Sequence, residues 1–396
     1  MQGGGKEVMK LEEILRDETV RQREFPVTKE RSFLAHAGDC PLPARVARAI
    51  GEYALEATLG DQEKPVFPDL LTDTRSAVAR LLEVSPEEVA MVGPTSLGLN
   101  LVASGFPLRR GDNAIIYFDD YPSNVYPWMA LADRGVKVRF IHARAWGRVK
   151  PHDILEQVDE QTRLVALSTC HFITGWRLDY AEVAKELDAQ GIAVCLDGIQ
   201  TVGAFSTPLK HIAFMASDAH KWMLGPCGAG ILYVRKDWQE KLRPTVLGWN
   251  NVRCPGFVAS EKMEFRSGAH RYEAGSYNWM GMAGMKAAID LLLEVGVDAI
   301  SQELLRKRTL MVSGLLARGF EVIEPEMTKR NASGIVSFRR GHEDMESLHA
   351  SLDLKGVITS LRSNRAGVKW IRLSPHFYNT DGDLDRLFEC LSHRGF

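Results

Sequence analysis

The sequence predicts an α/β protein built on a mostly parallel β-sheet with helices on both faces. From about Phe33 onward, short β-rich runs alternate with segments of helical periodicity, which is typical of this fold class. Residues 191–196 form a continuously apolar run, as expected for a strand buried on both faces. The chain has 396 residues, enough for two domains with substantial cores.

The elements follow one another in a regular order. A charged segment with a short helical pattern at 9–15 is expected to form an N-terminal arm, residues 1–30. Helical periodicity then predicts helices over 43–57, 69–83 and 180–190. Strand-like runs occupy residues 89–92, 114–118, 136–141, 164–168, 191–196 and 231–234.

We expect a large domain over 31–280 and a smaller C-terminal α+β domain over 281–396. The second begins with a long helical pattern that includes residues 287–293, followed by helix, strand and helix. No internal repeat or low-complexity tract interrupts either part.

Composition excludes several classes of protein. The net charge is -2 and no basic block occurs, so a nucleic-acid partner is not expected. No apolar run approaches the roughly 20 residues of a transmembrane helix, and residues 1–6 lack the apolar core of a signal peptide. The six cysteines are scattered without a Cys-x-x-Cys pair, which favours reduced thiols over disulfides or a zinc site. These features predict a soluble cytoplasmic protein with no membrane partner.

An aspartate and a lysine carry the strongest chemical signal. Asp197 ends the apolar run 191–196, and Lys221 follows among small and aromatic residues before Gly225, Gly228 and Gly230. Pyridoxal phosphate needs a lysine to hold its aldehyde as a Schiff base and an acid to keep its pyridine nitrogen protonated. An exposed lysine and a helix-capping aspartate would explain each residue separately. The pairing and the glycines favour the cofactor.

These motifs resemble a known family. Asp-Gly-Ile-Gln at 197–200 and Asp-Ala-His-Lys-Trp-Met-Leu-Gly-Pro at 218–226 resemble the class V aminotransferase superfamily of fold-type I pyridoxal-phosphate enzymes. Residues 371–380, Ile-Arg-Leu-Ser-Pro-His-Phe-Tyr-Asn-Thr, resemble its C-terminal signature. The superfamily includes cysteine desulfurases, selenocysteine lyases, kynureninase and isopenicillin N epimerase-like proteins. The resemblance extends from about Phe33 to Leu391 and implies pyridoxal 5'-phosphate as cofactor, with Lys221 and Asp197 as catalytic residues.

A phosphate site is expected where residues 94–100 enter a helix. Hydroxyls and free amides at a helix N-terminus bind anions, although a plain capping role would also explain Thr95 and Ser96. The resemblance assigns both residues to the cofactor phosphate and adds His220 as a second donor. From the residues alone, His220 would instead be a structural histidine.

Two further residues are expected at the cofactor ring. Tyr121 follows a strand end, where the family places a ring that stacks on the pyridine; without the resemblance it is also explained as a surface tyrosine. Cysteine desulfurases carry an asparagine where Phe172 aligns, near the phenolic oxygen of the cofactor. Because Phe172 cannot make that contact, Gln200 is the candidate to hydrogen-bond this oxygen.

Substrate and subunit contacts are inferred at three more positions. Arg372 lies on an apolar strand and needs an anionic partner, either an internal carboxylate or, as the resemblance implies, the carboxylate of an amino-acid substrate. Gly275 and Ser276 alone predict only a turn. The resemblance assigns them to a loop that reaches the phosphate of a neighbouring subunit, which implies a homodimer.

One missing residue bears on the reaction. Most cysteine desulfurases carry a nucleophilic cysteine on a loop shortly before the substrate arginine, but residues 359–369 contain none. We therefore expect a cysteine desulfurase or selenocysteine lyase-like C–S (C–Se) lyase that lacks this cysteine. An amino-acid epimerase or aminotransferase is the alternative. A non-catalytic cofactor-binding or regulatory member would have no need of Lys221.

Overall fold

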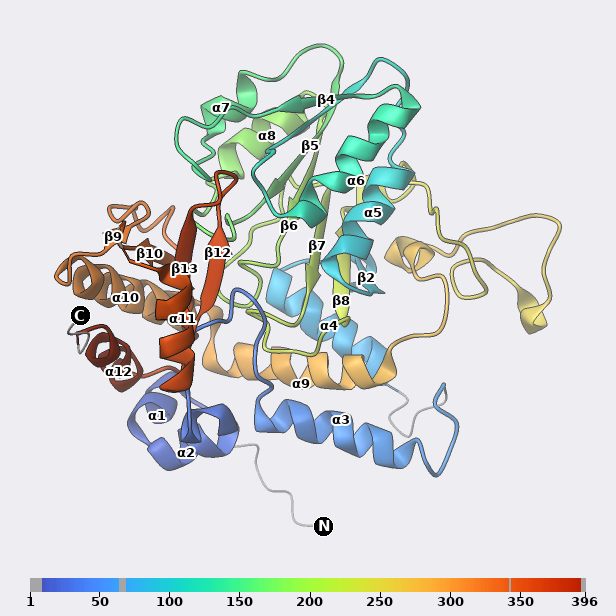
Figure 1. The fold of residues 1–396 in the computed structure, drawn as a ribbon. Coiled ribbons are helices and arrows are strands. Elements are labelled where there is room, and N and C mark those ends of the chain that lie inside the picture. The colour runs from blue at the N-terminus through green and yellow to red at the C-terminus, as the bar shows by residue number, and fades with distance from the viewer. Residues whose placement is uncertain (1–8, 64–68, 342, 393–396) are drawn as a thin grey trace.

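The computed structural model describes residues 9–63, 69–341 and 343–392. The first eight residues of the predicted N-terminal arm and the last four of the predicted C-terminal domain lie outside this range. Within it, a seven-stranded sheet has the order β2-β8-β7-β6-β5-β3-β4 (Figure 1). Strands β3 to β7 pair in parallel, whereas β8 is antiparallel to β7 and β2. The predicted mostly parallel sheet is confirmed. The strands are β2 (Val89–Val92), β3 (Asn113–Ile116), β4 (Lys137–Phe140), β5 (Thr162–Ser168), β6 (Ala193–Asp197), β7 (Phe214–Asp218) and β8 (Gly230–Val234).

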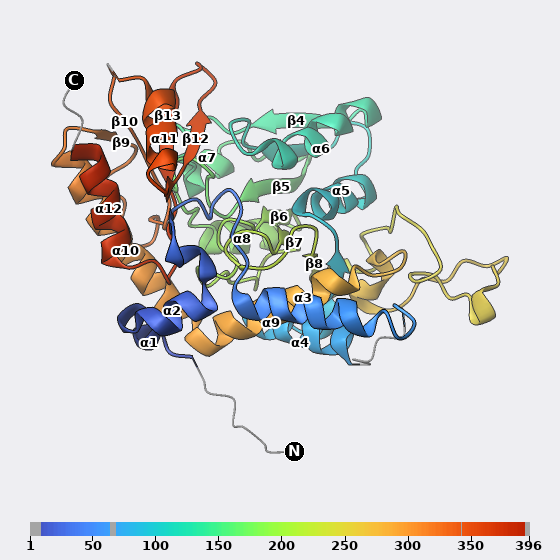
Figure 2. The ribbon, with the colours of Figure 1, turned by 60° about the horizontal axis from the view of Figure 1, so that its bottom comes forward.

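Helices cover both faces of this sheet because successive strand residues point to opposite sides. In β6, Ala193 and Cys195 pack into one apolar cluster, with α5 and α6, while Val194 and Leu196 pack into the other, with α4, α8 and α9. Helix α3 lies along α9 (Figure 2). The bounds are α3 (Ala44–Glu56), α4 (Leu70–Leu82), α5 (Thr95–Gly105), α6 (Tyr126–Met129), α7 (Pro151–Leu155), α8 (Ala181–Ala189) and α9 (Trp279–Val295).

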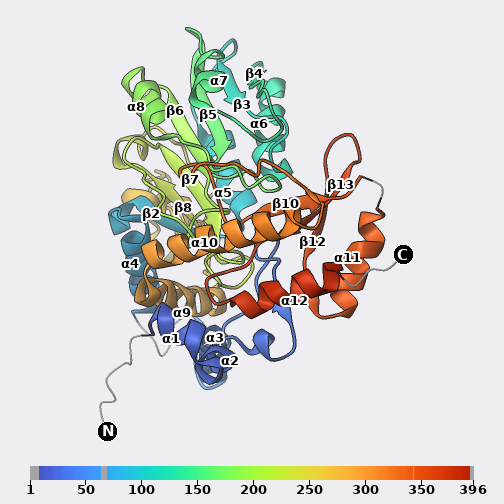
Figure 3. The ribbon, with the colours of Figure 1, turned by 90° about the vertical axis from the view of Figure 1, so that its left-hand side faces the viewer.

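A smaller antiparallel sheet follows, in the order β12-β13-β10-β9. Its outer face packs on three helices, seen around it in Figure 3, through an apolar cluster that includes Met311, Leu348 and Leu387. Its inner face carries polar residues instead: the Ser337 hydroxyl donates to the Ile173 carbonyl at 2.6 Å. The elements are α10 (Val297–Leu316), β9 (Glu321–Val322), β10 (Val336–Arg339), α11 (Met345–Leu354), β12 (Ser360–Ser363), β13 (Lys369–Leu373) and α12 (Asp381–Ser392).

The beginning of the chain joins this smaller sheet region. After α1 (Leu11–Arg16) and α2 (Glu18–Glu24), strand β1 (Ser32–Phe33) pairs in parallel with β11 (Val357–Ile358). The domain limits at 30 and 280 stay a prediction. No helix in the described part of the chain has both the length and the apolar character needed to cross a bilayer.

Candidate active site

A cavity of about 160 Å³ lies at the carboxyl ends of the parallel strands, beside the inner face of the smaller sheet. This edge is where open α/β sheets bind their ligands. The cavity is lined by every predicted site residue except Gly275 and Ser276: Thr95, Ser96, Tyr121, Asp197, Gln200, His220, Lys221 and Arg372.

Asp197 is the last residue of β6 and reaches the cavity from the centre of the sheet. Its side chain is 2% exposed, and its Oδ1 accepts a hydrogen bond from the Ile199 amide at 3.0 Å. Burial, and then the negative charge of Asp120, raise the pKa of Asp197 above its ordinary value. A buried carboxylate of this kind is stabilised by a cationic partner, which a protonated pyridine nitrogen would supply.

Lys221 follows β7 on a turn that also bounds the cavity. Its backbone carbonyl accepts from the Leu224 amide at 3.2 Å, and Leu224 has a left-handed φ of 58°. The Lys221 Nζ lies 5.3 Å from the centroid of the Tyr121 ring. Burial lowers the pKa of Lys221 below its ordinary value, which favours the neutral amine that attacks an aldehyde.

The N-terminus of α5 forms one wall with the properties of an anion site. The first amides of a helix have no intrahelical partner and point outward from its end. The Ser96 hydroxyl donates to the Ser123 hydroxyl at 2.8 Å, while Thr95 Oγ1 accepts from the Asp218 amide at 2.9 Å. His220 Nδ1 lies 2.9 Å from Asp218 Oδ2 without the geometry of a hydrogen bond. A phosphate group placed at this wall would meet helix amides, hydroxyls and an imidazole.

Glycine at position 98 lets α5 approach the sheet closely. A β-carbon at Gly98 would lie 2.7 Å from the Ala216 β-carbon on β7, inside van der Waals contact. This close approach brings the helix end, with Thr95, directly beside the strand that precedes Lys221.

Apolar and aromatic groups line the same cavity as Lys221 and Asp197. The Tyr121 ring is 43% exposed and makes an edge contact with Phe172, at 5.3 Å between centroids. The side chain of Ile199 also lines the cavity. A flat heteroaromatic ring fits between such surfaces.

Gln200 is fixed by two hydrogen bonds. Its Oε1 accepts from the Trp222 indole at 2.8 Å, and its Nε2 donates to the Ala37 carbonyl at 3.0 Å. One amide hydrogen of Nε2 is left for a further contact. The predicted bond from Gln200 to the cofactor oxygen stays a prediction.

Two arginines enter the cavity from the smaller sheet. Arg372 is 1% exposed; its Nη1 donates to the Phe172 carbonyl at 2.6 Å and its Nη2 to the Ser360 hydroxyl at 3.3 Å, while its buried Nε has no partner. Arg362 is half-buried, and its Nη1 donates to the Leu361 carbonyl. Burial, and next the positive charge of Arg362, lower the pKa of Arg372 to about 9. This pair places two positive charges at the cavity.

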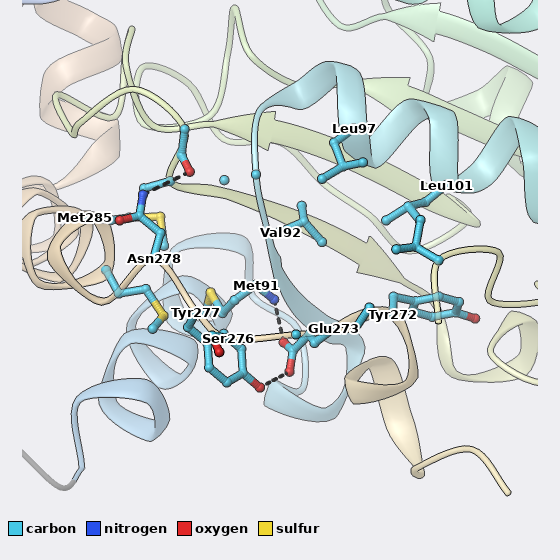
Figure 4. Close-up of a pocket in the computed structure, with 18 residues that line it drawn as sticks. Met91, Val92, Leu97, Leu101, Tyr272, Glu273, Ser276, Tyr277, Asn278 and Met285 are labelled. Carbon is cyan, nitrogen blue, oxygen red and sulfur yellow. Dashed lines mark hydrogen bonds between the residues drawn. The ribbon is translucent and has the colours of Figure 1, made fainter. Parts of the chain in front are cut away.

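Gly275 and Ser276 line a different, larger cavity of about 300 Å³, which also includes Gly93 and Gly230 (Figure 4). The Ser276 hydroxyl donates to the Glu63 carboxylate. Within one chain, therefore, this loop does not reach Lys221. Its predicted contact with the phosphate of a second subunit stays a prediction.

Sequence reasoning missed Arg362, Ser123 and Ile199 as cavity residues. Ile199 lies within the Asp-Gly-Ile-Gln motif, and Ser123 lies two residues after Tyr121, so proximity to predicted residues was an available signal. For Arg362 the sequence indicated only that residues 360–368 belong to a loop expected to carry substrate specificity, because the position of this side chain depends on the pairing of β12 with β13.

Comparison with known proteins identifies the family of this chain. Residues 32–387 match the family described as aminotransferase class-V. The chain is 28% identical over 397 residues to a probable cysteine desulfurase of Methanothermobacter thermautotrophicus, covering 96% of this chain and 98% of the relative. It is 27% identical to a cysteine desulfurase of an Enterobacter species, covering 87% and 84%.

Solved structures show the same fold. The apo cysteine desulfurase of Thermococcus onnurineus NA1 superimposes with a TM-score of 0.86 at 22% identity, covering 94% of this chain and 97% of that one. The cystine C–S lyase C-DES in complex with cysteine persulfide gives a TM-score of 0.84 at 21% identity, with coverage of 94% and 100%.

The fold and the cavity define a pyridoxal-phosphate-dependent enzyme. The chain belongs to the class V aminotransferase family. The predicted family, fold class and cofactor are confirmed.

Proposed function

We propose that this protein is a pyridoxal-phosphate-dependent lyase that breaks the C–S or C–Se bond of a cysteine-like amino acid. The observation that carries the proposal is the convergence of Lys221, Asp197 and Arg372 on one cavity. The relatives named cysteine desulfurase support the choice of a sulfur substrate. When bound, pyridoxal phosphate supplies an electron-withdrawing ring that accommodates negative charge developing at the substrate Cα.

Each of the three residues has a separate task. Lys221 holds the cofactor aldehyde, and its Nζ then takes the proton from Cα as a general base. The Asp197 carboxylate keeps the pyridine nitrogen protonated. Arg372 binds the α-carboxylate and so orients the Cα–H bond toward Lys221. Thr95, Ser96 and His220 hold the phosphate, while Tyr121 and Gln200 hold the ring.

The sulfur leaves without a protein thiol as acceptor. After Cα loses its proton, the electron pair left at Cα forms a Cα–Cβ double bond while the Cβ–S bond breaks, and the sulfur departs with its bonding electrons and takes up a proton. Water then hydrolyses the released enamine to pyruvate and ammonia. No cysteine occurs between Cys254 and Cys390, and residues 364–368 form the short connection between β12 and β13. We therefore expect elimination, with pyruvate and ammonia as the other products, rather than transfer of sulfur to the enzyme and release of alanine.

Product analysis tests the proposal. The purified holoenzyme is incubated with cysteine, cystine and selenocysteine, and sulfide or selenide, pyruvate, alanine and keto acids are measured in parallel. We expect pyruvate together with released sulfur or selenium, and none of either from Lys221→Ala. Racemised amino acid or a transaminated keto acid without sulfur release would instead identify the epimerase or aminotransferase reaction. A cofactor-loaded protein that converts no amino acid would identify a non-catalytic member.

We also propose that the enzyme is a cytoplasmic homodimer. The six cysteines form no disulfide, which fits a reducing compartment. Exposed apolar residues line the larger cavity that Gly275 and Ser276 also line, as a subunit interface requires: Leu97 and Val246 are 41% and 48% exposed.

A further inference from the structure

Arg362 and Arg372 lie on the same face of the smaller sheet. In the register of β12 with β13, Arg372 pairs with Ser360 and Arg362 pairs with Trp370. Residues two apart on a strand share a face, so Ser360, Arg362 and Arg372 all point inward, away from the apolar cluster under the sheet. The two arginines are therefore diagonal neighbours.

The two guanidinium groups also converge. The position that a β-carbon would take at Gly38 lies 3.5 Å from Nη2 of Arg362 and 3.5 Å from Nη2 of Arg372. The two nitrogen atoms are thus at most twice that distance apart. Glycine at this position keeps a side chain out of the space that both groups border.

In the described part of the chain, no carboxylate lies in contact with this pair of charges. Among the described residues, neither guanidinium makes an ion pair; Asp39 acts on both only from beyond contact distance. Two like charges held this close are costly without an anion between or beside them. The α-carboxylate of a substrate would neutralise one of the two guanidinium groups. The other guanidinium group would still lack an anionic partner.

The two arginines differ in burial, and this difference indicates that they bind different groups of the substrate. Arg372 is fully buried on the floor of the cavity, as suits a group that every substrate must engage. Arg362 is more exposed than Arg372, so it remains accessible to a group carried by the substrate side chain.

We propose that Arg362 binds a second anionic group, carried by the substrate side chain. The preferred substrates are sulfur amino acids with an acidic group attached through the sulfur, such as a carboxylate or a sulfonate. This inference rests on the proposed function for the reaction but concerns recognition alone. Arg362 is then the residue that selects dianionic substrates over simple ones.

Ligand binding tests recognition separately from catalysis. Succinate and butyrate have the same number of carbon atoms but two and one carboxylates, and calorimetry measures the binding of each to the holoenzyme. We expect succinate to bind about 10- to 100-fold more tightly, as for one added charged hydrogen bond, and Arg362→Gln to remove this preference. Arg339→Gln, on β10 of the same sheet and paired with Glu321, is the matched control and keeps it.

Three outcomes would overturn the inference: equal binding of the two ligands, a preference that survives Arg362→Gln, or equal losses for both ligands in that variant. The last would place Arg362 on the same carboxylate as Arg372. A kinetic arm compares S-sulfocysteine with S-methylcysteine, and we expect Arg362→Gln to lower kcat/KM for the first only. If no sulfur amino acid reacts, the proposed function fails while the succinate preference still decides the role of Arg362.

Discussion

The carboxylate of Asp197 is buried, so solvent cannot stabilise its negative charge. Its side chain is held by the Ile199 amide and by its position at the end of a central strand. A second carboxylate, that of Asp120, lies close enough to raise the pKa of Asp197. This arrangement would give a cationic ring nitrogen a charged partner. The role of Asp197 should therefore be visible in the rate rather than in the attachment of the cofactor.

We predict that Asp197→Asn lowers kcat on the order of 10²-fold or more, because an amide cannot keep the pyridine nitrogen protonated. The cofactor should still attach to Lys221. Borohydride reduction followed by peptide mapping checks attachment, and steady-state kinetics check the rate. Near-normal turnover would mean that another acid has this role, and a label on a different lysine would show that Lys221 is misassigned.

The residues of the site differ in how far the sequence reveals them. Asp197 and Lys221 are predictable because each belongs to a short motif whose residues stay together in the fold. Arg362 is not, because it reaches the cavity only through the register of β12 against β13. Gly275 and Ser276 are a third case, because within one chain they line another cavity. Their predicted role depends on a contact between two subunits.

At the scale of elements, Glu273 joins three separate parts of the large sheet region. Its carboxylate accepts from the Met91 amide on β2 and from the Tyr277 hydroxyl, each at 2.6 Å (Figure 4). It also accepts from Arg75 on α4 at 2.7 Å. These bonds fix both ends of the segment that carries Gly275 and Ser276. Burial alone would raise the pKa of Glu273, but hydrogen bonds from His270 and Arg75 outweigh it and lower the pKa to about 2.

We predict a specific loss of stability in acid from this carboxylate. Since its pKa is lower in the folded state than the ordinary 4.5, it stabilises the fold above pH 4.5, and this contribution is lost as the pH falls toward 2. The difference in unfolding free energy between the wild type and Glu273→Gln should shrink by about 2 kcal/mol between pH 6 and pH 3.

Denaturant unfolding at several pH values measures this difference. Glu346→Gln, a change at an exposed glutamate paired with Lys369, serves as the control and should give a small difference at every pH. A difference for Glu273→Gln that does not change with pH would contradict the low pKa.

Elements buried on both faces were the easiest to predict. The predicted strand at 191–196 overlaps β6, which spans Ala193–Asp197 and is buried along its whole length. A short, continuously apolar run is typical of such a strand. Strands β9 and β11 have two residues each and are defined by their partners, so no local pattern identifies them. The order of the smaller sheet likewise depends on long-range pairing that composition does not encode.

At the scale of the whole molecule, we predict a homodimer that a charge at the apolar surface disrupts. Leu97→Glu should yield monomers and abolish activity, because the exposed Leu97 borders the larger cavity and Ser276 would lose the neighbouring site. Sedimentation velocity with parallel assays checks both effects. Leu354→Glu, at an 88% exposed leucine on α11, is the control and should leave both unchanged. A wild-type protein that is monomeric and fully active at low concentration would refute the prediction.

The pairing of β1 with β11 has a consequence for the folding of the enzyme during its synthesis. His36 hydrogen-bonds to Ser374, a residue 338 positions later in the chain, and Gly38 forms part of the cavity wall. At about 5–20 residues per second, a ribosome needs on the order of tens of seconds to make the intervening chain. During that time the first strand has no partner and the cavity has no complete wall. We therefore expect the cofactor to be bound in its final form only after the C-terminal strands have emerged from the ribosome.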